Sequence, residues 1–301
     1  MRKAPLSITA TERRERASTP RNAPAEGVHG LLGLEGVAPA ELLRRGREEV
    51  RRYGGRILAG EVTAAVPADP TGAVDPRFTV TLADGTALRA RRLLVATGLR
   101  DVLPEVPGLA RHWGRGAVHC PYCHGWEVRD EAIGILAVGP ASVHHALPFR
   151  QLTDDLVYFR RGTALDQDTR ARLAARGIRV VDTPVAAVES AGDGSVEGVR
   201  LADGRIVPRR VLAVATTLWA RADGLGGLNL PMRDLPDSMG RHFATGPAGT
   251  TEVRGVWVAG NATEPMAQVG ASAAAGALAG SHIKADLVSA DTDAALAASG
   301  R

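Results

Sequence analysis

The sequence is poor in aromatic side chains and in cysteine. Phe, Trp and Tyr make up 4% of its 301 residues, and only two cysteines occur. The net charge of +4 comes from arginine pairs scattered along the chain, so no basic stripe with interleaved aromatics points to nucleic acid. No apolar run is long enough to span a bilayer, and the first residues lack the apolar core of a secretory signal. We therefore expect a cytoplasmic protein with no nucleic-acid or membrane partner.

The two cysteines, Cys120 and Cys123, stand in the run His-Cys-Pro-Tyr-Cys-His. In a reducing compartment, a pair this close is more often catalytic or metal-binding than a structural staple. Two intervening residues bring the sulfurs within reach of a strained, reducible disulfide. Pro121 suits the first turn of a helix, whose dipole stabilises a thiolate. His119 or His124 could stabilise the thiolate when protonated, or act as a general acid toward a departing thiol.

Several interpretations of this motif remain open, and we favour a redox-active disulfide served by flavin. Cys-X-X-Cys-His also matches the attachment motif of c-type haem, but that attachment needs export. A zinc site needs four ligands, whereas the adjacent His-Cys and Cys-His pairs are cramped and no second cysteine pair exists. We therefore expect no metal. A glutaredoxin-like fold carries its motif after the first strand, whereas this motif lies mid-chain. The last alternative is an inert buried pair.

An internal repeat indicates the architecture. Residues 82–97 (LADGTALRARRLLVAT) and 201–216 (LADGRIVPRRVLAVAT) align without gaps at an offset of 119. In each copy, Asp-Gly between alternating apolar residues predicts a hairpin with a type I′ turn. The apolar runs that follow, 93–96 and 211–215, predict buried strands, and a related strand is predicted at 255–260. Two copies separated by the length of a domain indicate duplicated domains of one type.

The strand ends carry a family resemblance. Flavoproteins with two dinucleotide-binding domains have one strand ending in Ala-Thr-Gly and a late strand ending in Gly-Asp. This chain has Val-Ala-Thr-Gly at 95–98 and Val-Ala-Gly-Asn at 258–261, with the cysteine motif between them. From about Pro20 to about Leu287 it resembles the thioredoxin reductase-like, FAD-dependent pyridine nucleotide-disulfide oxidoreductases. The resemblance implies an α/β fold of two Rossmann-like, three-layer domains, one inserted in the other.

The resemblance also implies a division of labour between the two domains. A discontinuous FAD-binding domain would comprise residues 1–116 and 217–301, and an NAD(P)H-binding domain with the dithiol would comprise residues 117–216. Electrons would pass from NADPH through FAD to Cys123. Cys120 would then attack an external disulfide, in a thioredoxin-like protein or a small molecule. By analogy with dimeric relatives, the chain would be a homodimer.

Candidate cofactor contacts lie in both halves. The resemblance assigns FAD contacts to these residues: Arg21, Asn22, His29, Val62, Thr97, Gly98, Gly260, Asn261, Gln268 and Val269. On the nicotinamide side, a strand at 133–138 is followed by a degenerate fingerprint in which Gly139 and Ser142 occupy two of the three small positions. Arg160 and Arg161 follow the next strand, where arginine accommodates the 2′-phosphate of NADP. We therefore expect NADPH.

Two positions depart from the family pattern. His124 stands where thioredoxin reductases have an acidic residue that serves as the proton donor, and imidazole titrates nearer neutrality. With the following Gly-Trp-Glu, it makes the chain similar to the dithiol oxidases of gliotoxin and holomycin biosynthesis, which close a disulfide in a small molecule with oxygen as acceptor. This is our second functional hypothesis. Asn261 stands for the usual acidic residue but can still hydrogen-bond a ribityl hydroxyl.

The family's opening strand and G-x-G-x-x-G turn are not recognisable. The repeat offset places them at residues 14–20, which lack an apolar run, and no glycine occurs before Gly27. We favour the explanation that residues 1–19 are non-native, from a truncated or frameshifted reading frame. The alternatives are a weak FAD site completed by a partner subunit, or a non-catalytic, flavin-free remnant.

Overall fold

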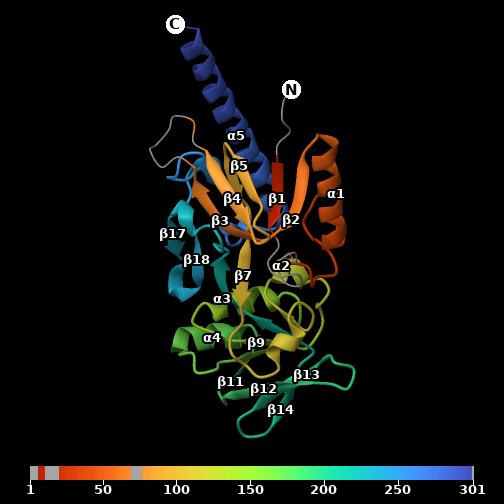
Figure 1. Ribbon diagram of the computed structural model, residues 1–301. Coiled ribbons are helices and arrows are strands. Elements are labelled where there is room, and N and C mark those ends of the chain that lie inside the picture. The colour runs from red at the N-terminus through yellow and green to blue at the C-terminus, as the bar shows by residue number, and fades with distance from the viewer. Residues whose placement is uncertain (1–5, 11–19, 69–74, 76, 300–301) are drawn as a thin grey trace.

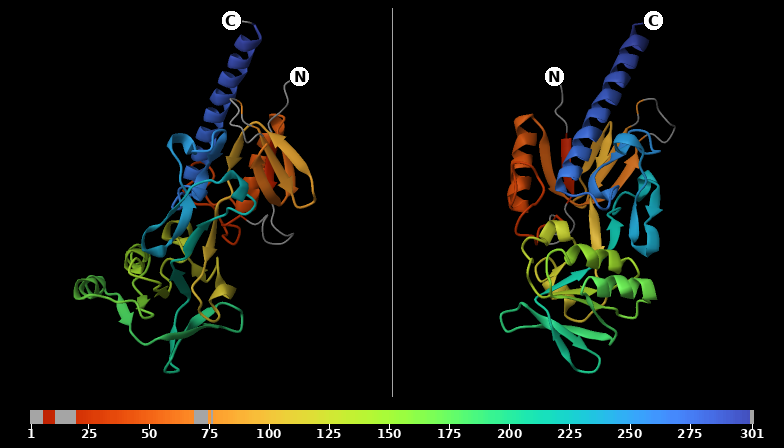
Figure 2. Two further views of the ribbon diagram at one scale, coloured as in Figure 1. Left: turned by 60° about the vertical axis from the view of Figure 1, so that its left-hand side comes forward. Right: turned by 180° about the vertical axis from the view of Figure 1, so that it is seen from behind.

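The structure is a computed structural model that describes residues 6–10, 20–68, 75 and 77–299. Its elements form two lobes, one above the other in Figure 1. The lower, inserted lobe extends from β8 (Ala117–Val118) to β15 (Val211–Val214). The upper, terminal lobe contains both β1 (Leu6–Ala10) and the last helix, α5 (Val269–Ala298). Figure 2 shows the same two lobes from two other directions.

A five-stranded sheet forms the centre of the inserted lobe. Its order is β11-β10-β9-β15-β8, and all neighbouring strands are parallel. The remaining elements of this lobe are β9 (Ile133–Leu136), α3 (Ser142–Phe149), β10 (Leu156–Phe159), α4 (Gln167–Ala175), β11 (Arg179–Val181), β12 (Val185–Ser190), β13 (Val196–Leu201) and β14 (Ile206–Pro208). Parallel strands pack apolar side chains on both faces, and this sheet does so.

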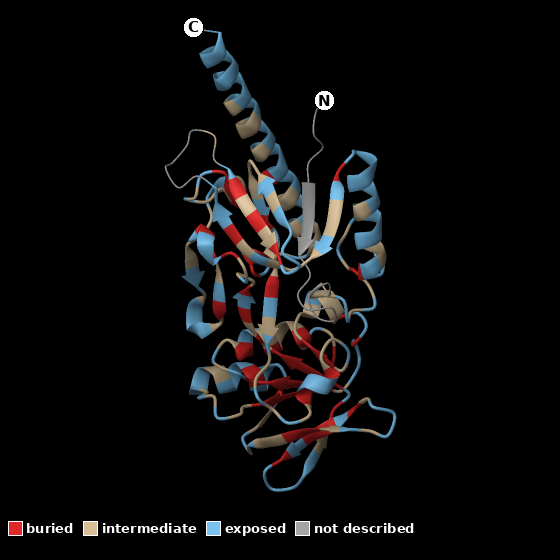
Figure 3. Cartoon of the chain, in the orientation of Figure 1, coloured by how far each residue is buried: buried red, intermediate tan, exposed pale blue. Residues whose placement is uncertain are grey.

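The two faces of this sheet have different partners. Ile133, Ile135 and Tyr158 pack with Phe149 of α3 and Leu173 of α4. The alternate residues Leu136, Val157, Phe159, Leu212 and Val214 pack instead against the antiparallel strands β12 and β13. Because successive side chains of a strand point to opposite faces, one short apolar run supplies both cores. Figure 3 shows the resulting concentration of buried residues in the sheet.

The terminal lobe is assembled from smaller sheets. Its strands are β1, β2 (Arg56–Gly60), β3 (Val62–Pro67), β4 (Phe78–Leu82), β5 (Ala87–Ala90), β6 (Leu93–Val95), β7 (Leu99–Val102), β16 (Thr217–Ala220), β17 (Met232–Asp234), β18 (Gly240–Phe243) and β19 (Val256–Val258). β1 pairs with β2 and β6 with β19, both in parallel. β3, β4 and β5 form an antiparallel sheet, and β17, β18, β16 and β7 form another sheet in that order. Helix α1 (Pro39–Arg52) lies beside β2.

Five short 3₁₀ helices complete the described chain: η1 (Leu109–His112), η2 (Gly226–Leu228), η3 (Pro236–Ser238), η4 (Pro247–Gly249) and η5 (Gly260–Ala262). The expected fold class is confirmed, because the chain is a mixed α/β protein with two Rossmann-like lobes. Leu109 of η1 packs in the core of the inserted lobe, ahead of the expected boundary at 117. The precise domain boundaries stay predictions.

Both copies of the internal repeat form the expected hairpin and strand. β4 and β5 make the first hairpin, β13 and β14 the second, and β6 and β15 are the strands that follow. The expected type I′ turn is wrong. That turn needs positive φ at both central residues. The Gly85 amide donates to the Leu82 carbonyl at 2.9 Å, so the central residues are Ala83 and Asp84, and neither has positive φ. Gly85, with φ +85°, follows them, and the Asp84 carboxylate accepts the Thr86 amide at 2.9 Å.

Residues 1–19 hold one strand that the sequence did not indicate. β1 lies parallel to β2, with Leu6 opposite Arg56 and Ala10 opposite Gly60. A strand is therefore present near the start of the chain, ahead of the place that the repeat offset gave. The glycine-rich turn remains absent from the sequence, since the first glycine is Gly27. Residues 14–19, where the repeat offset placed the missing strand, lie outside the described part of the chain.

The two crossings between the lobes pair with each other. β7 leads out of the terminal lobe and β16 leads back into it, and they are antiparallel, with Val102 opposite Thr217 and Leu99 opposite Ala220. In Figure 1, β7 extends from the upper lobe down to the lower one. The lobes are thus joined by two paired strands, which belong to the four-stranded sheet of β17, β18, β16 and β7.

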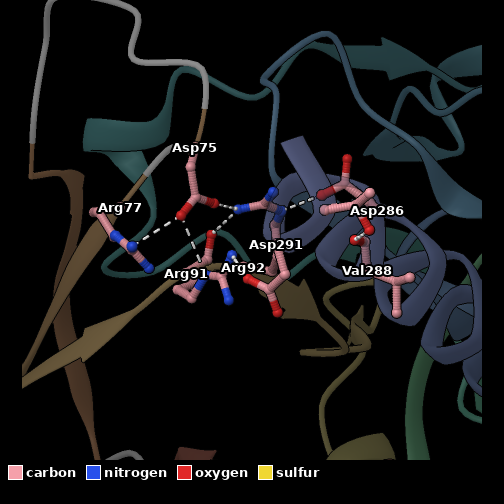
Figure 4. Close-up of polar contacts among 8 residues, drawn as sticks. Asp75, Arg77, Arg91, Arg92, Asp286, Val288 and Asp291 are labelled. Carbon is pink, nitrogen blue, oxygen red and sulfur yellow. Dashed lines mark hydrogen bonds and ion pairs between the residues drawn. The ribbon is translucent and has the colours of Figure 1, made fainter. Parts of the chain in front are cut away.

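Helix α5 projects beyond the terminal lobe and is exposed along most of its length (Figure 3). A cluster of opposite charges fastens its middle to the body (Figure 4). Arg92, whose side chain is only 3% exposed, contacts Asp286 of α5 and binds Asp75 at 2.7 Å. Its neighbour Arg91 binds Asp291 of α5 at 2.7 Å and also reaches Asp75. Two adjacent arginines therefore anchor a helix that has few apolar contacts there.

Candidate active site

The dithiol lies on the short helix α2 (Pro121–His124), at the junction of the lobes (Figure 1). Pro121 occupies the first turn, as expected. Cys120 precedes it in an extended conformation, and its carbonyl accepts the amides of Cys123 and His124. Both cysteines are free and half-buried. One turn of chain therefore presents both sulfurs from the same segment.

The two thiols differ in their readiness to ionise. A hydrogen bond from the Cys123 thiol lowers the pKa of Cys120 to about 7, despite partial burial. Hydrogen bonds from the backbone amides of Tyr122 and Cys123 act in the same direction. The same hydrogen bond to the Cys120 sulfur, together with burial, raises the pKa of Cys123. Because the thiolate is the reactive form, these shifts favour Cys120 as the nucleophile and Cys123 as its proton-bearing partner, and these two roles stay a prediction.

The positive charge beside the dithiol comes from Arg21. Its field lowers the pKa of Cys120, and it acts on both sulfurs. Its guanidinium is held by Asp101 of β7, through Nε to Oδ2 at 2.5 Å and Nη2 to Oδ1 at 2.7 Å. The Thr216 hydroxyl also donates to Asp101 Oδ1, at 2.6 Å. Arg21, expected at the flavin, thus also reaches the dithiol.

The two histidines that flank the motif are not its source of positive charge. Burial lowers the pKa of both His119 and His124, so each is mainly neutral near pH 7. His119 Nδ1 lies 3.2 Å from the Val214 carbonyl, an acceptor that fixes the proton on Nδ1. Buried His145 of α3, whose pKa falls to about 4 through burial, contacts the His119 carbonyl. Among the described residues, no hydrogen-bond partner meets the buried Nδ1 of His124.

Residues 20–38, here called the junction loop, run past the dithiol and make contacts on both lobes. Besides Arg21, the loop carries His29, whose Nδ1 binds Glu35 at 2.5 Å and whose Nε2 contacts Glu127. Glu127 stands three residues after the end of α2. A side chain at Gly114 would meet Pro24 of the loop at 2.2 Å, so loop and inserted lobe are tightly packed there.

A hollow of about 350 Å³ lies where the junction loop meets the start of α5. It is lined by Gly30, Glu264, Met266, Ala267, Gln268, Gly270 and Ala271. The first amides of α5 have no side-chain cap, so they are free to bind oxygen atoms of a ligand. Gln268 and Val269, two of the expected FAD contacts, are thus at the start of this helix.

The residues that follow β6 and β19 lie together beside α5, the helix whose first residues line the hollow. Gly98 has φ +73°, and a side chain there would come within 3.2 Å of Asn261 Oδ1. The Thr97 hydroxyl donates to the Arg221 carbonyl at 2.7 Å. A side chain at Gly260 would lie 3.7 Å from Ser272 of α5. The structure therefore brings Thr97, Gly98, Gly260 and Asn261 together, as expected.

Two other expected FAD contacts lie apart from this group. Val62 begins β3, and its carbonyl packs against Gly224 rather than at the hollow. Asn22 is half-buried in the junction loop, where its carbonyl accepts the Ala25 amide. The contacts of these two residues point to a structural part in the loop and strand. Their role toward a cofactor stays a prediction.

The expected nicotinamide contacts gather at the end of β9 and β10. The Ser142 hydroxyl is buried and accepts the Val138 amide at 2.9 Å, which closes the loop around Gly139. Arg160 forms an ion pair with Asp182 at 2.7 Å. Arg161 donates to the Ala137 carbonyl at 2.9 Å and contacts no carboxylate among the described residues. Arg161 is therefore the better placed of the two for a phosphate.

Several residues of the site were not singled out from the sequence. They are Glu35, Asp101, Glu127, His145 and Thr216. Glu127 was used in the sequence analysis only as part of the run Gly-Trp-Glu, which resembles the dithiol oxidases, and no role in the site was assigned to it. Asp101 and Thr216 are 115 residues apart and meet only through the pairing of β7 with β16, so no local pattern could reveal them.

Comparison with known proteins adds a family to this geometry. The sequence profile described as pyridine nucleotide-disulphide oxidoreductase matches residues 2–276. The chain belongs to this family. Among curated relatives, thioredoxin reductase tcpT of Claviceps purpurea (strain 20.1) is 31% identical over 251 residues, 80% of this chain and 75% of that protein. Thioredoxin reductase sirT of Leptosphaeria maculans is 29% identical over 286 residues, 90% of this chain and 85% of that protein.

Solved structures of family members show the same arrangement of lobes. HlmI is 38% identical with a TM-score of 0.88, covering 98% of this chain and 88% of its own. An oxidoreductase from Agrobacterium tumefaciens is 34% identical with a TM-score of 0.83, covering 95% and 91%. These likenesses confirm an FAD-dependent disulfide oxidoreductase of the thioredoxin reductase type, in a family whose members use FAD and NADPH. The route of the electrons stays a prediction.

The described residues fit one end of FAD. The uncapped start of α5, the hollow beside it and the glycine at the end of β6 suit a flavin ring and its ribityl chain, whose oxygens accept hydrogen bonds. For the adenine end, the sequence offers no glycine-rich turn ahead of Gly27. When bound, the flavin supplies electron exchange between a nicotinamide and the dithiol.

Two further findings concern metals and membranes. Within the described ranges, no group of three or more His, Cys, Asp or Glu side chains is arranged to hold a metal ion. Among the same residues, no helix combines the length and the apolar character needed to cross a membrane.

Proposed function

We propose that the chain passes electrons from NADPH through FAD to the Cys120–Cys123 disulfide, and from the resulting dithiol to an external disulfide. The observation that carries this proposal is the placement of two free, half-buried thiols on one short helix at the junction of the two lobes. A reductase needs one thiolate nucleophile and one thiol held in reserve, and the lowered pKa of Cys120 beside the raised pKa of Cys123 agrees with this need.

The chemistry of the reducing step follows from this pair. The Cys120 thiolate attacks one sulfur of the external disulfide, and the other sulfur departs as a thiolate that takes up a proton. Cys123 then loses its proton and attacks Cys120, which closes the protein disulfide and releases the second substrate sulfur. The substrate gains two electrons and two protons, and NADPH restores the dithiol through FAD. Cys123 is thus the thiol that faces the flavin in this order of transfer.

We assign the nicotinamide site to the end of β9 and β10. The support is Arg161, which has no carboxylate partner among the described residues and borders the Gly139 loop. A free guanidinium there suits the 2′-phosphate of NADPH better than the hydroxyl of NADH. The need for reduced thiols supports a cytoplasmic location, and homodimer formation is proposed by analogy with dimeric relatives.

A second candidate is a dithiol oxidase, which runs the cysteine pair in the opposite direction and returns electrons to oxygen. His124, which stands where thioredoxin reductases have an acidic residue, favours it, because a neutral imidazole can take the proton of an incoming thiol. Tyr122 and Trp126 support a small, apolar dithiol as its substrate, since these aromatic side chains beside the motif are 70% and 68% exposed.

Anaerobic reduction of the purified chain tests both directions. If the protein is a reductase, NADPH bleaches its flavin absorbance and a disulfide substrate restores the colour. Bleaching by a small dithiol but not by NADPH contradicts the reductase and supports the oxidase. No flavin absorbance after incubation with FAD contradicts both and leaves the flavin-free remnant.

Replacing the flavin-facing cysteine tests the order of transfer. In Cys123→Ser, we expect NADPH to reduce the flavin at a rate close to that of the wild type. Turnover of a disulfide substrate should fall by at least about 10³-fold, because the mixed disulfide on Cys120 cannot be resolved. Rapid-mixing absorbance measures the first step and steady-state assay the second. Loss of flavin reduction in this variant would contradict the proposed order.

A further inference from the structure

His29 of the junction loop joins two carboxylates that come from different parts of the molecule. Its Nδ1 binds Glu35, in the same loop, at 2.5 Å, and its Nε2 contacts Glu127, next to the dithiol helix. The Glu35 side chain is 64% exposed, whereas those of His29 and Glu127 are largely covered. The contact with Glu127 therefore ties the dithiol segment to the loop of the terminal lobe.

This geometry requires an extra proton. A carboxylate has no N–H or O–H donor, and a neutral imidazole has one. A neutral imidazole can therefore donate to only one of two carboxylates. With both partners in contact, the ring must carry protons on both nitrogens, or one carboxylate must be protonated. The first is favoured, because hydrogen bonds to Glu35 and Glu127 raise the pKa of His29 and the bond from His29 lowers the pKa of Glu35.

Both ends of the bridge are fixed by further contacts. On the loop side, the Gly30 amide donates to Glu35 at 3.0 Å, and a side chain at Gly30 would lie 3.5 Å from Gln268 at the hollow. On the dithiol side, Glu127 acts electrostatically on Cys123 and on His124. The bridge thus links the wall of the hollow at α5 to the segment that carries Cys123, the cysteine that faces the flavin in the proposed function.

We propose that His29 is a positioning residue, which in its charged form latches the dithiol segment against the junction loop and so holds Cys123 toward the flavin hollow. The inference rests on the proposed function, because it assumes that flavin and dithiol exchange electrons. The charged or titratable groups that face His29 are Glu35 from its own loop and Glu127 and His124 from the dithiol segment. Its role differs from the flavin contact that the resemblance implies.

The latch is closed only within a window of pH. It forms while His29 is charged and holds Glu35 and Glu127 together. As pH rises through the raised pKa of His29, the ring keeps one proton. We expect this proton to stay on Nδ1, toward Glu35, whose hydrogen bond raises the pKa of His29 most, so that Glu127 is released. Electron exchange with the dithiol is therefore expected to slow on the alkaline side.

Hydrogen exchange of the full-length chain tests the latch without bound flavin. At about pH 6, we expect amides of residues 121–131 to lose protection roughly two- to fivefold in His29→Gln, the effect of an exposed charge pair. At about pH 9, wild type and variant should agree after correction for intrinsic rates. His282→Gln, an exposed histidine on α5, is the matched control and should behave as the wild type. Equal protection of wild type and His29→Gln at the lower pH would overturn the latch.

A second measurement does not depend on the loss of a side chain. The His29 imidazole signal, assigned by its disappearance in His29→Gln, should titrate above the ordinary value in the wild type. Glu35→Gln and Glu127→Gln should each move its titration to lower pH. A His29 that titrates at or below the ordinary value, or that ignores both substitutions, contradicts the proposal.

In flavin-loaded protein, rapid mixing separates positioning from chemistry. His29→Gln should leave flavin reduction by NADPH unchanged and slow electron exchange between flavin and dithiol, with the alkaline decline removed from its pH profile. An equal loss in both steps overturns the positioning role. Since the exchange and titration measurements need no flavin, a failure of the proposed function does not decide them.

Discussion

Arg21 shows how one residue can serve two parts of the molecule. Its guanidinium forms two hydrogen bonds to Asp101, and its charge acts on both sulfurs. The field of a nearby cation favours a thiolate over a thiol. Since burial keeps His119 and His124 neutral, Arg21 is the cation that this effect depends on in the described site.

Replacing Arg21 tests this assignment. In Arg21→Gln, we expect the pKa of Cys120 to rise above its value of about 7, so that less thiolate is present at neutral pH. The rate of alkylation of Cys120 at pH 7 should fall roughly two- to tenfold, and the rate profile should move to higher pH. Thiolate absorbance against pH gives the pKa directly. Arg51→Gln, on the exposed face of α1, is the control, and an unchanged Cys120 titration in Arg21→Gln would refute the role.

At the scale of single helices and strands, the sequence pattern predicted the features that depend on residues close together in the chain. The two hairpins, the strands after them and the turn at Pro121 follow from alternation and from proline, whose effects extend over a few residues. The predicted turn type was wrong, and the observed turn is one in which the Asp84 carboxylate accepts the Thr86 amide. β1 was missed since a short strand beside β2 gains its stability from pairing, which no local pattern encodes.

The anchoring of α5 gives a prediction for one element. Arg92→Ala removes the buried guanidinium that joins Asp286 to Asp75, so each of these carboxylates loses its ion pair with Arg92. We expect a loss of about 2 kcal/mol in the free energy of unfolding, and faster hydrogen exchange in the second half of α5. Urea unfolding and hydrogen exchange measure these effects. Asp291→Asn, at the exposed end of the cluster, should cost less than about 1 kcal/mol, and equal costs would contradict the anchor.

For the molecule as a whole, the contacts that matter most join segments far apart in the sequence. Asp101 of β7 receives Arg21 from the junction loop and Thr216 from the return crossing, and its side chain is only 6% exposed. Burial alone would raise the pKa of Asp101, but the hydrogen bonds from Arg21 hold it below its ordinary value. Sequence patterns predict the two lobes. They cannot predict that the junction loop, β7 and the return crossing meet at Asp101.

This meeting of segments predicts a pH-dependent stability. Asp101→Asn should cost about 2 kcal/mol at neutral pH, because Arg21 is left partly buried without its counter-charge. A carboxylate with a lowered pKa stabilises the fold above its unfolded value, and this contribution is lost as pH falls through the folded one. The difference from the wild type should thus be full above about pH 4 and shrink below it. Urea titrations of the wild type and Asp101→Asn at neutral pH and below about pH 4 measure this difference in the free energy of unfolding. Asp154→Asn, in an exposed pair with Arg150, is the control.

The paired crossings have a mechanical consequence. Stretching β7 and β16 apart or bending them in the plane of their sheet would break hydrogen bonds, whereas paired strands twist more readily. β16 also pairs with β18, so the body of the terminal lobe supports the pair along one side. If one lobe turns against the other, we therefore expect the turn to be a twist of these strands at a nearly constant spacing of the lobes. The contact between His29 and Glu127 joins the junction loop to the dithiol segment independently of these strands, so it would oppose such a twist.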